Sequence, residues 1–257
     1  MELNIKNKVV VITGGSKGIG LAAAKSFARE GCKTAICGRN QYSLETAADQ
    51  IKTISPEVYY ETLDVTDTPS LRNFAENVSK KWGSIDIWIN NAGIPIHKPM
   101  METSDAQWDQ IIATNLTAVY QGCKVAASHM LKNGGVIFNA GSFQTVFPAA
   151  GSGPYGATKA AVASLTRTFA AELASKKIRV LTYIPGVIET PMANVDNWAQ
   201  ETNQLDNIPV KRLGTPEDIA DTLVFLASEK ASYINGVSIE ITGGKFCVQN
   251  PGYAWEL

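Results

Sequence analysis

The chain has 257 residues, 45% of them hydrophobic, and a formal net charge of −1 at pH 7. This length and composition are typical of one globular domain over residues 1–257, and the near-neutral charge argues against electrostatic binding of nucleic acid. No run of about 18 uninterrupted apolar residues predicts a membrane span, and the first residues lack the hydrophobic stretch of a signal peptide.

Short β-branched runs alternate with longer helical patterns along the chain. The apolar run at 9–12 is typical of a strand buried on both faces, and a glycine-rich turn and a helix to about residue 30 follow it. The other expected strands are 34–37, 58–63, 85–89, 136–138, 178–184 and 237–241. The other expected helices are 43–54, 70–82, 104–131 and 155–175, and a last one begins at Thr215, Pro216, Glu217 and Asp218.

Strands separated by helices predict an α/β fold: a doubly wound, seven-stranded parallel sheet (Rossmann-type) flanked by helices, in a single domain. One long segment, 187–212, has no clear periodicity, and loops of that length inside compact domains are often lids or binding loops. Its apolar residues would form the roof of such a lid, with core packing as the alternative. These residues are Met192, Val195, Trp198 and Leu205.

The four cysteines, Cys32, Cys37, Cys123 and Cys247, are spread along the chain. They form no C-x-x-C pair and no histidine cluster accompanies them, so we expect no metal site. Unpaired cysteines favour a reducing, cytoplasmic setting. Because a free cysteine behaves as a small apolar side chain, we expect all four to be buried.

A glycine-rich turn lies between the first strand and the first helix. Glycine permits a tight turn in which backbone N–H groups approach a pyrophosphate, and the helix N-terminus adds a favourable dipole. Because strand, turn and helix agree, this segment predicts a dinucleotide site. The expected contacts are Gly14, Ser16, Lys17, Gly18, Ile19 and Gly20.

The end of the second strand indicates which dinucleotide binds. Many dinucleotide folds place an acid there, about 20 residues beyond the glycines, to bind the ribose 2′-hydroxyl. Here Arg39 and Asn40 occupy that place, and an arginine can bind a 2′-phosphate through forked, charge-assisted hydrogen bonds. With Lys17 as a second cation, the sequence predicts NADP (NADPH) rather than NAD. Two solvated surface cations are the alternative.

Tyr155 and Lys159 lie four residues apart on a predicted helix and therefore share one face. Reduction of a ketone by hydride needs an acid and oxidation of an alcohol needs a base, but a free tyrosine has a pKa near 10. An ammonium about 5 Å away favours the phenolate by roughly 3 kcal/mol. This spacing is common by chance, but Ser142 follows the fifth strand, where open α/β sheets bind ligands.

The glycine spacing G-x-x-x-G-x-G, preceded by Thr13, resembles that of the short-chain dehydrogenase/reductase family. Further motifs extend the resemblance over residues 6–244: Asn-Asn-Ala-Gly after the fourth strand and Pro-Gly after the sixth. The resemblance implies catalytic roles for Asn115, Ser142, Tyr155 and Lys159. It implies further cofactor contacts at Asp64, Val65, Asn91, Ala92, Gly93, Tyr155, Lys159, Pro185, Gly186, Ile188 and Thr190.

Several of these residues have more than one interpretation. The resemblance implies that Lys159 also binds the nicotinamide ribose and that Asn115 holds a water chain for proton relay. A helix kink or a buried hydrogen bond is the alternative for Asn115, and a plain turn residue or N-cap is the alternative for Asp64. Of the two histidines, we expect His129 to be structural, and His97 to lie in a loop that either touches substrate or is simply surface.

These observations predict an NADPH-dependent oxidoreductase that acts on a small-molecule ketone or secondary alcohol. The stretch from Lys211 to Gly214 resembles 3-oxoacyl-carrier-protein reductases, whereas the tail at 245–257, with Tyr253 and Trp255, departs from them. Sugar, polyol and hydroxysteroid dehydrogenases share much of the pattern. A non-catalytic dinucleotide-sensing regulator has the same fold, but it would not need the serine, tyrosine and lysine together.

The resemblance also implies a homo-oligomer, a tetramer or a dimer, because family members usually pair through their two long helices. Here those are the helices expected at 104–131 and 155–175. The second carries small residues that would permit close helix approach: Ala160, Ala161, Ala163, Ala170 and Ala171.

Overall fold

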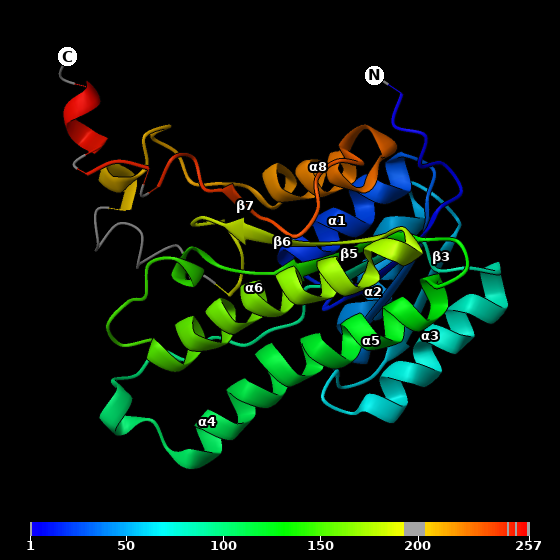
Figure 1. The fold of residues 1–257 in the computed structure, drawn as a ribbon, viewed down its shortest axis with the longest axis horizontal. Coiled ribbons are helices and arrows are strands. Elements are labelled where there is room, and N and C mark those ends of the chain that lie inside the picture. The colour runs from blue at the N-terminus through cyan, green and yellow to red at the C-terminus, as the bar shows by residue number, and fades with distance from the viewer. Residues whose placement is uncertain (1, 193–203, 246, 250, 256–257) are drawn as a thin grey trace.

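The computed structural model describes residues 2–192, 204–245, 247–249 and 251–255. Its centre is a seven-stranded sheet in the order β3-β2-β1-β4-β5-β6-β7 (Figure 1), with every neighbouring pair parallel. The predicted α/β parallel sheet is therefore confirmed. The strands are β1 (Val9–Thr13), β2 (Lys33–Gly38), β3 (Val58–Thr62), β4 (Ile87–Asn90), β5 (Gly135–Ala140), β6 (Ile178–Pro185) and β7 (Ser238–Ile241).

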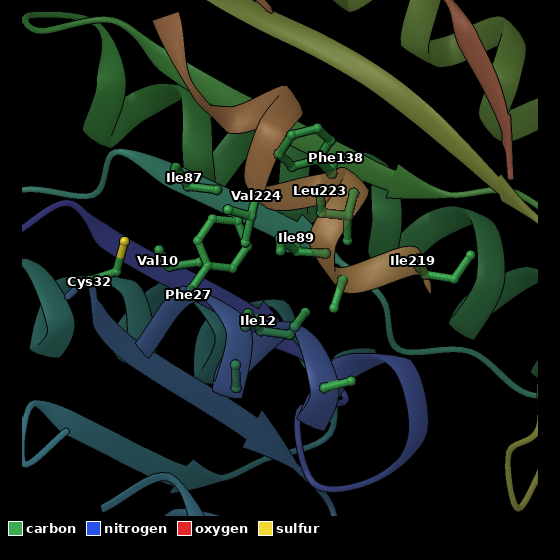
Figure 2. Packing of buried hydrophobic residues seen from close by; sticks show 14 of the residues in the cluster. Val10, Ile12, Phe27, Cys32, Ile87, Ile89, Phe138, Ile219, Leu223 and Val224 are labelled. Carbon is green, nitrogen blue, oxygen red and sulfur yellow. The ribbon is translucent and has the colours of Figure 1, made fainter. Parts of the chain in front are cut away.

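Helices cover both faces of the sheet, as the predicted double winding requires. On one face α1, α2 and α8 pack against the strands, and Figure 2 shows Phe27 of α1 next to Val224 of α8 and Val10 of β1. On the other face α3, α5 and α6 contribute to a second core. The helices are α1 (Gly18–Arg29), α2 (Gln41–Lys52), α3 (Thr68–Trp82), α4 (Asp105–Ile112), α5 (Ala118–Met130), α6 (Gly153–Leu173) and α8 (Pro216–Ala227).

The strand order reverses between β1 and β4, which are neighbours in the sheet although two strands separate them in the chain. In open α/β sheets a crevice forms outside the carboxyl ends of the strands at such a point, and ligands bind there. The glycine-rich turn follows β1 and the Asn-Asn-Ala-Gly motif follows β4. The topology therefore brings these two motifs to one place.

The helix expected at 104–131 is not regular throughout. It is α helix in α4 and α5, but the five residues Ala113–Thr117 between them form a π-helical turn. Such wide turns frequently mark functional sites. Asn115 lies in this turn, and its side chain bonds the backbone of Ile94 on another segment. The local hydrophobic pattern does not contain this long-range contact, so it predicted one regular helix.

Most other boundaries differ from the expected ones by about two residues, the ordinary uncertainty of helix ends. Asn40 and Asp67 cap α2 and α3, so both helices begin earlier than expected. In contrast, Thr215 caps α8 with a capping box that includes Asp218, which confirms the predicted start. β4 begins only at Ile87.

Three of the four cysteines are buried, as expected, and burial raises the pKa of the Cys32, Cys37 and Cys123 thiols to about 12. Cys247 is exposed, and the prediction that it is buried is wrong. It lies beyond β7, outside the layers of the sheet. No helix within the described ranges is long and apolar enough to cross a membrane.

Candidate active site

The glycine-rich turn after β1 has a backbone shape that only glycine adopts without strain. Gly14 and Gly18 have φ angles of +66° and +52°. A Cβ on Gly14 would lie 2.9 Å from the Cα of Ala92, and one on Gly18 would lie 3.2 Å from Cγ2 of Thr190. The turn is thus closely packed against the segments after β4 and β6, and the structure brings these predicted cofactor residues together.

The N-terminus of α1 opens directly from this turn. Its N-cap residue, Lys17, makes no side-chain cap hydrogen bond, so the N–H groups of the first turn remain available to a ligand. A Cβ on Gly20 would collide with the carbonyl oxygen of Gly14, which explains the third glycine of the motif. A narrow cradle with free N–H groups at a helix N-terminus suits the pyrophosphate of a dinucleotide.

A hydrogen-bond network fastens the motif after β4 to the turn. The Thr13 hydroxyl accepts from the backbone N–H groups of Asn91 (3.0 Å) and Ala92 (3.1 Å). The Asn91 Nδ2 donates to the carbonyl oxygens of Thr13 and Gly14, both at 3.1 Å. The network holds Asn91 and Ala92 beside the cradle, through interactions between strand ends that are adjacent only in the folded sheet.

Tyr183 of β6 completes this network, although no sequence motif predicted a role for it. Its hydroxyl donates to Oδ1 of Asn91 at 3.0 Å, and its side chain is only 1% exposed. Burial raises the pKa of this phenol well above its ordinary value. A tyrosine within a largely buried strand is a signal that could have identified it, because a buried hydroxyl usually has a hydrogen-bond partner.

The residues expected to select NADP lie at the end of β2. Arg39 and Lys17 are both exposed, and within the described ranges neither takes part in an ion pair. A Cβ on Gly38 would lie 3.8 Å from Oγ of Ser16, so the end of β2 adjoins the glycine-rich turn. The side chain of Asn40 accepts a hydrogen bond from Ser43 N at 2.8 Å as the cap of α2.

Asp64 and Val65 follow β3 at the same edge of the sheet. Oδ1 of Asp64 accepts from both the backbone N–H and the hydroxyl of Thr66, each at 2.9 Å, and so closes a turn. Val65 is buried in the core next to α3. Asp64 therefore has a turn role in the structure, and its contact with the adenine stays a prediction.

Ser142 and Tyr155 meet beyond the carboxyl end of β5. Ser142 precedes a short 3₁₀ helix, Phe143–Thr145, and its Oγ accepts from the backbone N–H of Gln144 at 3.2 Å. A hydrogen bond from Ser142 lowers the pKa of Tyr155, but burial has the larger effect and raises it above the ordinary value. The phenol is therefore protonated at neutral pH.

Lys159 lies one helical turn after Tyr155 and is only 3% exposed. Its ammonium donates to the carbonyl oxygen of Ala140 at 2.7 Å and lies 5.6 Å from the centroid of the Tyr155 ring. Burial lowers the pKa of Lys159 to about 8. The sequence predicted that this ammonium would lower the pKa of Tyr155, but the raised pKa shows that desolvation of the phenol dominates here.

Asn115 connects the π-helical turn to the segment after β4. It is fully buried, its Oδ1 accepts from Ile94 N and its Nδ2 donates to Ile94 O, each at 2.9 Å. A Cβ on Gly93 would lie 3.3 Å from Oδ1 of Asn115 and 3.8 Å from Nζ of Lys159. Both side chains thus border Gly93, where a larger residue would press on them.

The segment after β6 lies across the same end of the sheet. Pro185 ends β6, a Cβ on Gly186 would lie 2.8 Å from Cα of Thr242, and Ile188 forms a bridge with Gly214. The predicted lid can be followed only in part. Met192 and Leu205 are 49% and 43% exposed, whereas Val195 and Trp198 lie outside the described residues.

The C-terminal tail packs against the far end of that segment. The indole of Trp255 donates to the carbonyl oxygen of Pro209 at 2.8 Å, and a Cβ on Gly244 would lie 2.9 Å from Pro209. In Figure 1 the red tail helix therefore lies beside the gold segment that precedes α8. The tail thus contacts the segment before α8 although Trp255 and Pro209 are 46 positions apart in the chain.

The two histidines lie apart from Tyr155 and Lys159 in the chain. His97 is exposed in the loop after Gly93, and His129 is half-buried near the end of α5, where burial lowers its pKa. In the parts of the chain that the structure describes, no three His, Cys, Asp or Glu side chains cluster as a metal site would require.

Comparison with known proteins gives a consistent picture. A family profile described as "Enoyl-(Acyl carrier protein) reductase" matches residues 14–245. A 3-oxoacyl-[acyl-carrier-protein] reductase of Chlamydia pneumoniae is 35% identical over 95% of this chain and 99% of its own length. A 2,5-dichloro-2,5-cyclohexadiene-1,4-diol dehydrogenase of Sphingobium indicum is 38% identical over 95% of this chain and 98% of its own.

Two further proteins extend the comparison. A 3alpha-hydroxysteroid dehydrogenase of Mediterraneibacter gnavus is 34% identical over 95% of this chain and 98% of its own. The crystal structure of a short-chain type dehydrogenase/reductase from Mycobacterium marinum superimposes with a TM-score of 0.90 at 31% identity, covering 96% of this chain and 98% of that one. The chain therefore belongs to the short-chain dehydrogenase/reductase family, whose members are oxidoreductases of CH–OH and C=O groups that use a nicotinamide dinucleotide.

Proposed function

We propose that the chain is an NADPH-dependent oxidoreductase that interconverts a ketone and a secondary alcohol, with Tyr155 as the acid/base. The observation that carries this proposal is the joint position of three groups. The Tyr155 phenol lies close enough to Ser142 for that hydroxyl to lower its pKa, and it lies beside the buried ammonium of Lys159. These groups lie at the carboxyl edge of the sheet, next to a cradle that suits a dinucleotide.

The protonation states suit reduction of a carbonyl. Because burial raises the pKa of Tyr155, its phenol holds a proton to donate to the substrate oxygen. NADPH, when bound, would supply the hydride. Ser142 accepts a hydrogen bond from the backbone N–H of Gln144, so its own hydrogen is free to donate toward the phenol or the substrate oxygen.

Lys159 and Asn115 support this proton transfer. When Tyr155 gives up its proton, the nearby ammonium of Lys159 stabilises the phenolate. At pH 7 that ammonium is mostly charged, because its pKa is about 8. Asn115, by bonding both backbone groups of Ile94, keeps the segment after β4 close to Lys159. We propose that the same lysine also binds the nicotinamide ribose and that Asn115 borders the proton-relay water chain.

We propose NADPH rather than NADH because of the charges at the end of β2. Arg39 and Lys17 are exposed at adjoining turns, and no acid lies after β2 to bind a ribose 2′-hydroxyl. Arg39→Asp should lower kcat/KM for NADPH at least tenfold, a loss typical of a charge-assisted hydrogen bond, while kcat/KM for NADH is kept or rises. Equal use of both cofactors by the wild type would contradict this preference.

The proposed reaction is tested by a substrate screen of the purified protein. Oxidation of NADPH is followed with ketones, sugars, steroid ketones and 3-oxoacyl thioesters, and reduction of NADP with the matching alcohols. Turnover of at least one ketone or alcohol that disappears in Tyr155→Phe supports the proposal. Binding of NADPH without turnover of any substrate would support the regulator instead.

A second candidate is a 3-oxoacyl-carrier-protein reductase, and the 35% identity to the Chlamydia pneumoniae enzyme favours it. The stretch at 211–214 that resembles such enzymes has a structural role here, because Arg212 forms two hydrogen bonds with Asp218 at the start of α8. The tail that binds Pro209 through Trp255 lies at the substrate end. Activity with 3-oxoacyl thioesters above that with all other ketones would select this candidate.

We also propose a homo-oligomer that pairs through α5 and α6. Of the small residues on α6, Ala163 and Ala170 belong to the core of the chain, whereas Ala160 and Ala171 are exposed and available to a second copy. Light scattering at micromolar concentration should give the mass of a tetramer or a dimer. A monomer would contradict the proposal.

A further inference from the structure

Gln144 is a buried polar residue between the two elements that carry Ser142 and Tyr155. It is 7% exposed and lies in the 3₁₀ helix that Ser142 begins. A Cβ on Gly156, the residue after Tyr155, would lie 3.5 Å from Oε1 of Gln144. The carboxamide therefore packs against the first turn of α6, within one residue of Tyr155.

One end of this carboxamide is fixed by the protein. Ser152, which is 3% exposed, donates its hydroxyl hydrogen to Oε1 of Gln144 at 2.8 Å. The carbonyl oxygen of Ser152 in turn accepts from the backbone N–H of Gly156 at the start of α6. Because Oε1 is held from the helix side, the orientation of the amide is set and its NH₂ group must point away from Ser152.

The NH₂ end has no protein partner in the described part of the chain. None of the hydrogen bonds among the described residues uses Nε2 of Gln144, and the enclosed side-chain atoms without a partner in these ranges are Thr34 Oγ1 and Gln121 Oε1. Nε2 is therefore not sealed in the core. A buried amide with one end anchored and an unpartnered donor at the other is arranged to bind an acceptor.

We propose that Gln144 determines substrate specificity by donating a hydrogen bond from Nε2 to a second oxygen of the substrate, next to the reacting C–O group. Its backbone N–H donates to Oγ of Ser142 at 3.2 Å, so Gln144 is joined directly to the residue that would hold the reacting oxygen. This favours compounds with a hydroxyl or carbonyl oxygen on the neighbouring carbon: α-hydroxyketones, α-diketones and vicinal diols.

This inference rests on the proposed reductase function, and paired substrates test it. Acetoin and diacetyl carry the second oxygen, whereas butanone has the same carbon chain without it. In Gln144→Leu, kcat/KM for acetoin and diacetyl should fall about tenfold, the effect of one lost neutral hydrogen bond, while kcat/KM for butanone changes less than about twofold. Ser152→Ala, which frees Oε1, should lower the acetoin-to-butanone ratio by a smaller factor.

Two controls separate this effect from general damage. Gln50→Leu makes the same substitution on the exposed face of α2 and should leave both values unchanged. The affinity for NADPH, measured by its fluorescence, should be the same in Gln144→Leu and wild type. An equal fall for all three substrates, or an unchanged ratio, would overturn the role of Gln144. A wild type that reduces none of these ketones while reducing others would also overturn it, whereas a wild type that reduces no carbonyl compound at all would overturn the proposed function itself.

Discussion

The chain contains two pairs of Tyr and Lys at the same spacing on neighbouring helices: Tyr120 and Lys124 on α5, and Tyr155 and Lys159 on α6. Both lysines lie above the ring of their tyrosine, at 5.3 Å and 5.6 Å from its centroid. Figure 1 shows the two helices side by side on one face of the sheet. As local sequence and as local geometry, the two pairs are nearly the same.

Their surroundings differ. Tyr120 is 38% exposed and packs on Phe169 of α6, and Lys124 is exposed. Lys159 is buried, its ammonium is held by a strand carbonyl and its pKa is lowered, while Tyr155 has a serine partner. The four-residue spacing therefore only places a tyrosine next to a lysine. Burial at the carboxyl ends of the strands is what makes the α6 pair, and not the α5 pair, a candidate acid/base.

The largest expected effect is a difference in kcat between variants of the two tyrosines. Tyr155→Phe removes only the hydroxyl, so folding should survive while kcat falls about 10²–10⁴-fold, the usual contribution of a positioned proton donor. Tyr120→Phe should change kcat less than about twofold, because its ring keeps the contact with Phe169. Steady-state rates of both variants with the same ketone measure the contrast. A folded Tyr155→Phe with near wild-type turnover would show that the mechanism is wrong.

The next largest effect is a difference in kcat and NADPH binding between variants of the two lysines. Lys159→Met should reduce kcat about a hundredfold and weaken NADPH binding, whereas Lys124→Met should do neither. The wild-type rate of reduction should fall as the pH rises through about 8, because the Lys159 ammonium then loses its proton. This limb of the pH profile should vanish in Lys159→Met and persist in Lys124→Met. If the wild type and both lysine variants show the same fall in rate near pH 8, that fall belongs to the titration of another group.

Substitutions of two glycines test whether the glycine-rich turn after β1 binds NADPH. Gly14→Ala should lower the affinity for NADPH by more than about tenfold, since its Cβ would press on the backbone of Ala92. Gly83→Ala has the same unfavourable φ sign but no atom within 4 Å, so it should cost only about 1 kcal/mol of stability. Titration of NADPH fluorescence and thermal unfolding distinguish the two. Equal affinities would contradict the assignment of the cradle.

The smallest effect concerns the support of Asn91. Tyr183→Phe removes the hydrogen bond to Asn91 and should lower the free energy of unfolding by about 1 kcal/mol and the NADPH affinity a few-fold. Tyr59→Phe, which loses a comparable bond to Glu61 on the edge strand β3, should affect stability alone. If both variants bind NADPH equally well, Tyr183 is structural only.

The predicted strands and the alternating helices could be read from the sequence because strong local signals carry them. Continuous apolar runs, a glycine-rich turn and capping residues such as Thr215 act within a few residues of chain. The expected helix at 104–131 shows the limit. Its π-helical turn holds Asn115, which bonds Ile94 in a contact across 21 positions that no local pattern contains.

The candidate site divides in the same way. The motifs predicted the glycines, Asn115, Ser142, Tyr155 and Lys159 as site residues. The family that these motifs indicated is confirmed, while the catalytic roles stay predictions. Tyr183 and Gln144 were missed because neither belongs to a motif, and each matters only through a partner on another segment.

By itself, the sequence determined the elements, the family and the backbone positions where only glycine fits, because these follow from local sterics and from residues that recur at set spacings. Only the tertiary structure decided the strand order, which tyrosine–lysine pair is desolvated, and which buried polar groups have hydrogen-bond partners. The physical reason is that desolvation and hydrogen-bond satisfaction depend on everything packed around a group. Those neighbours come from strands and helices that are far apart in the chain.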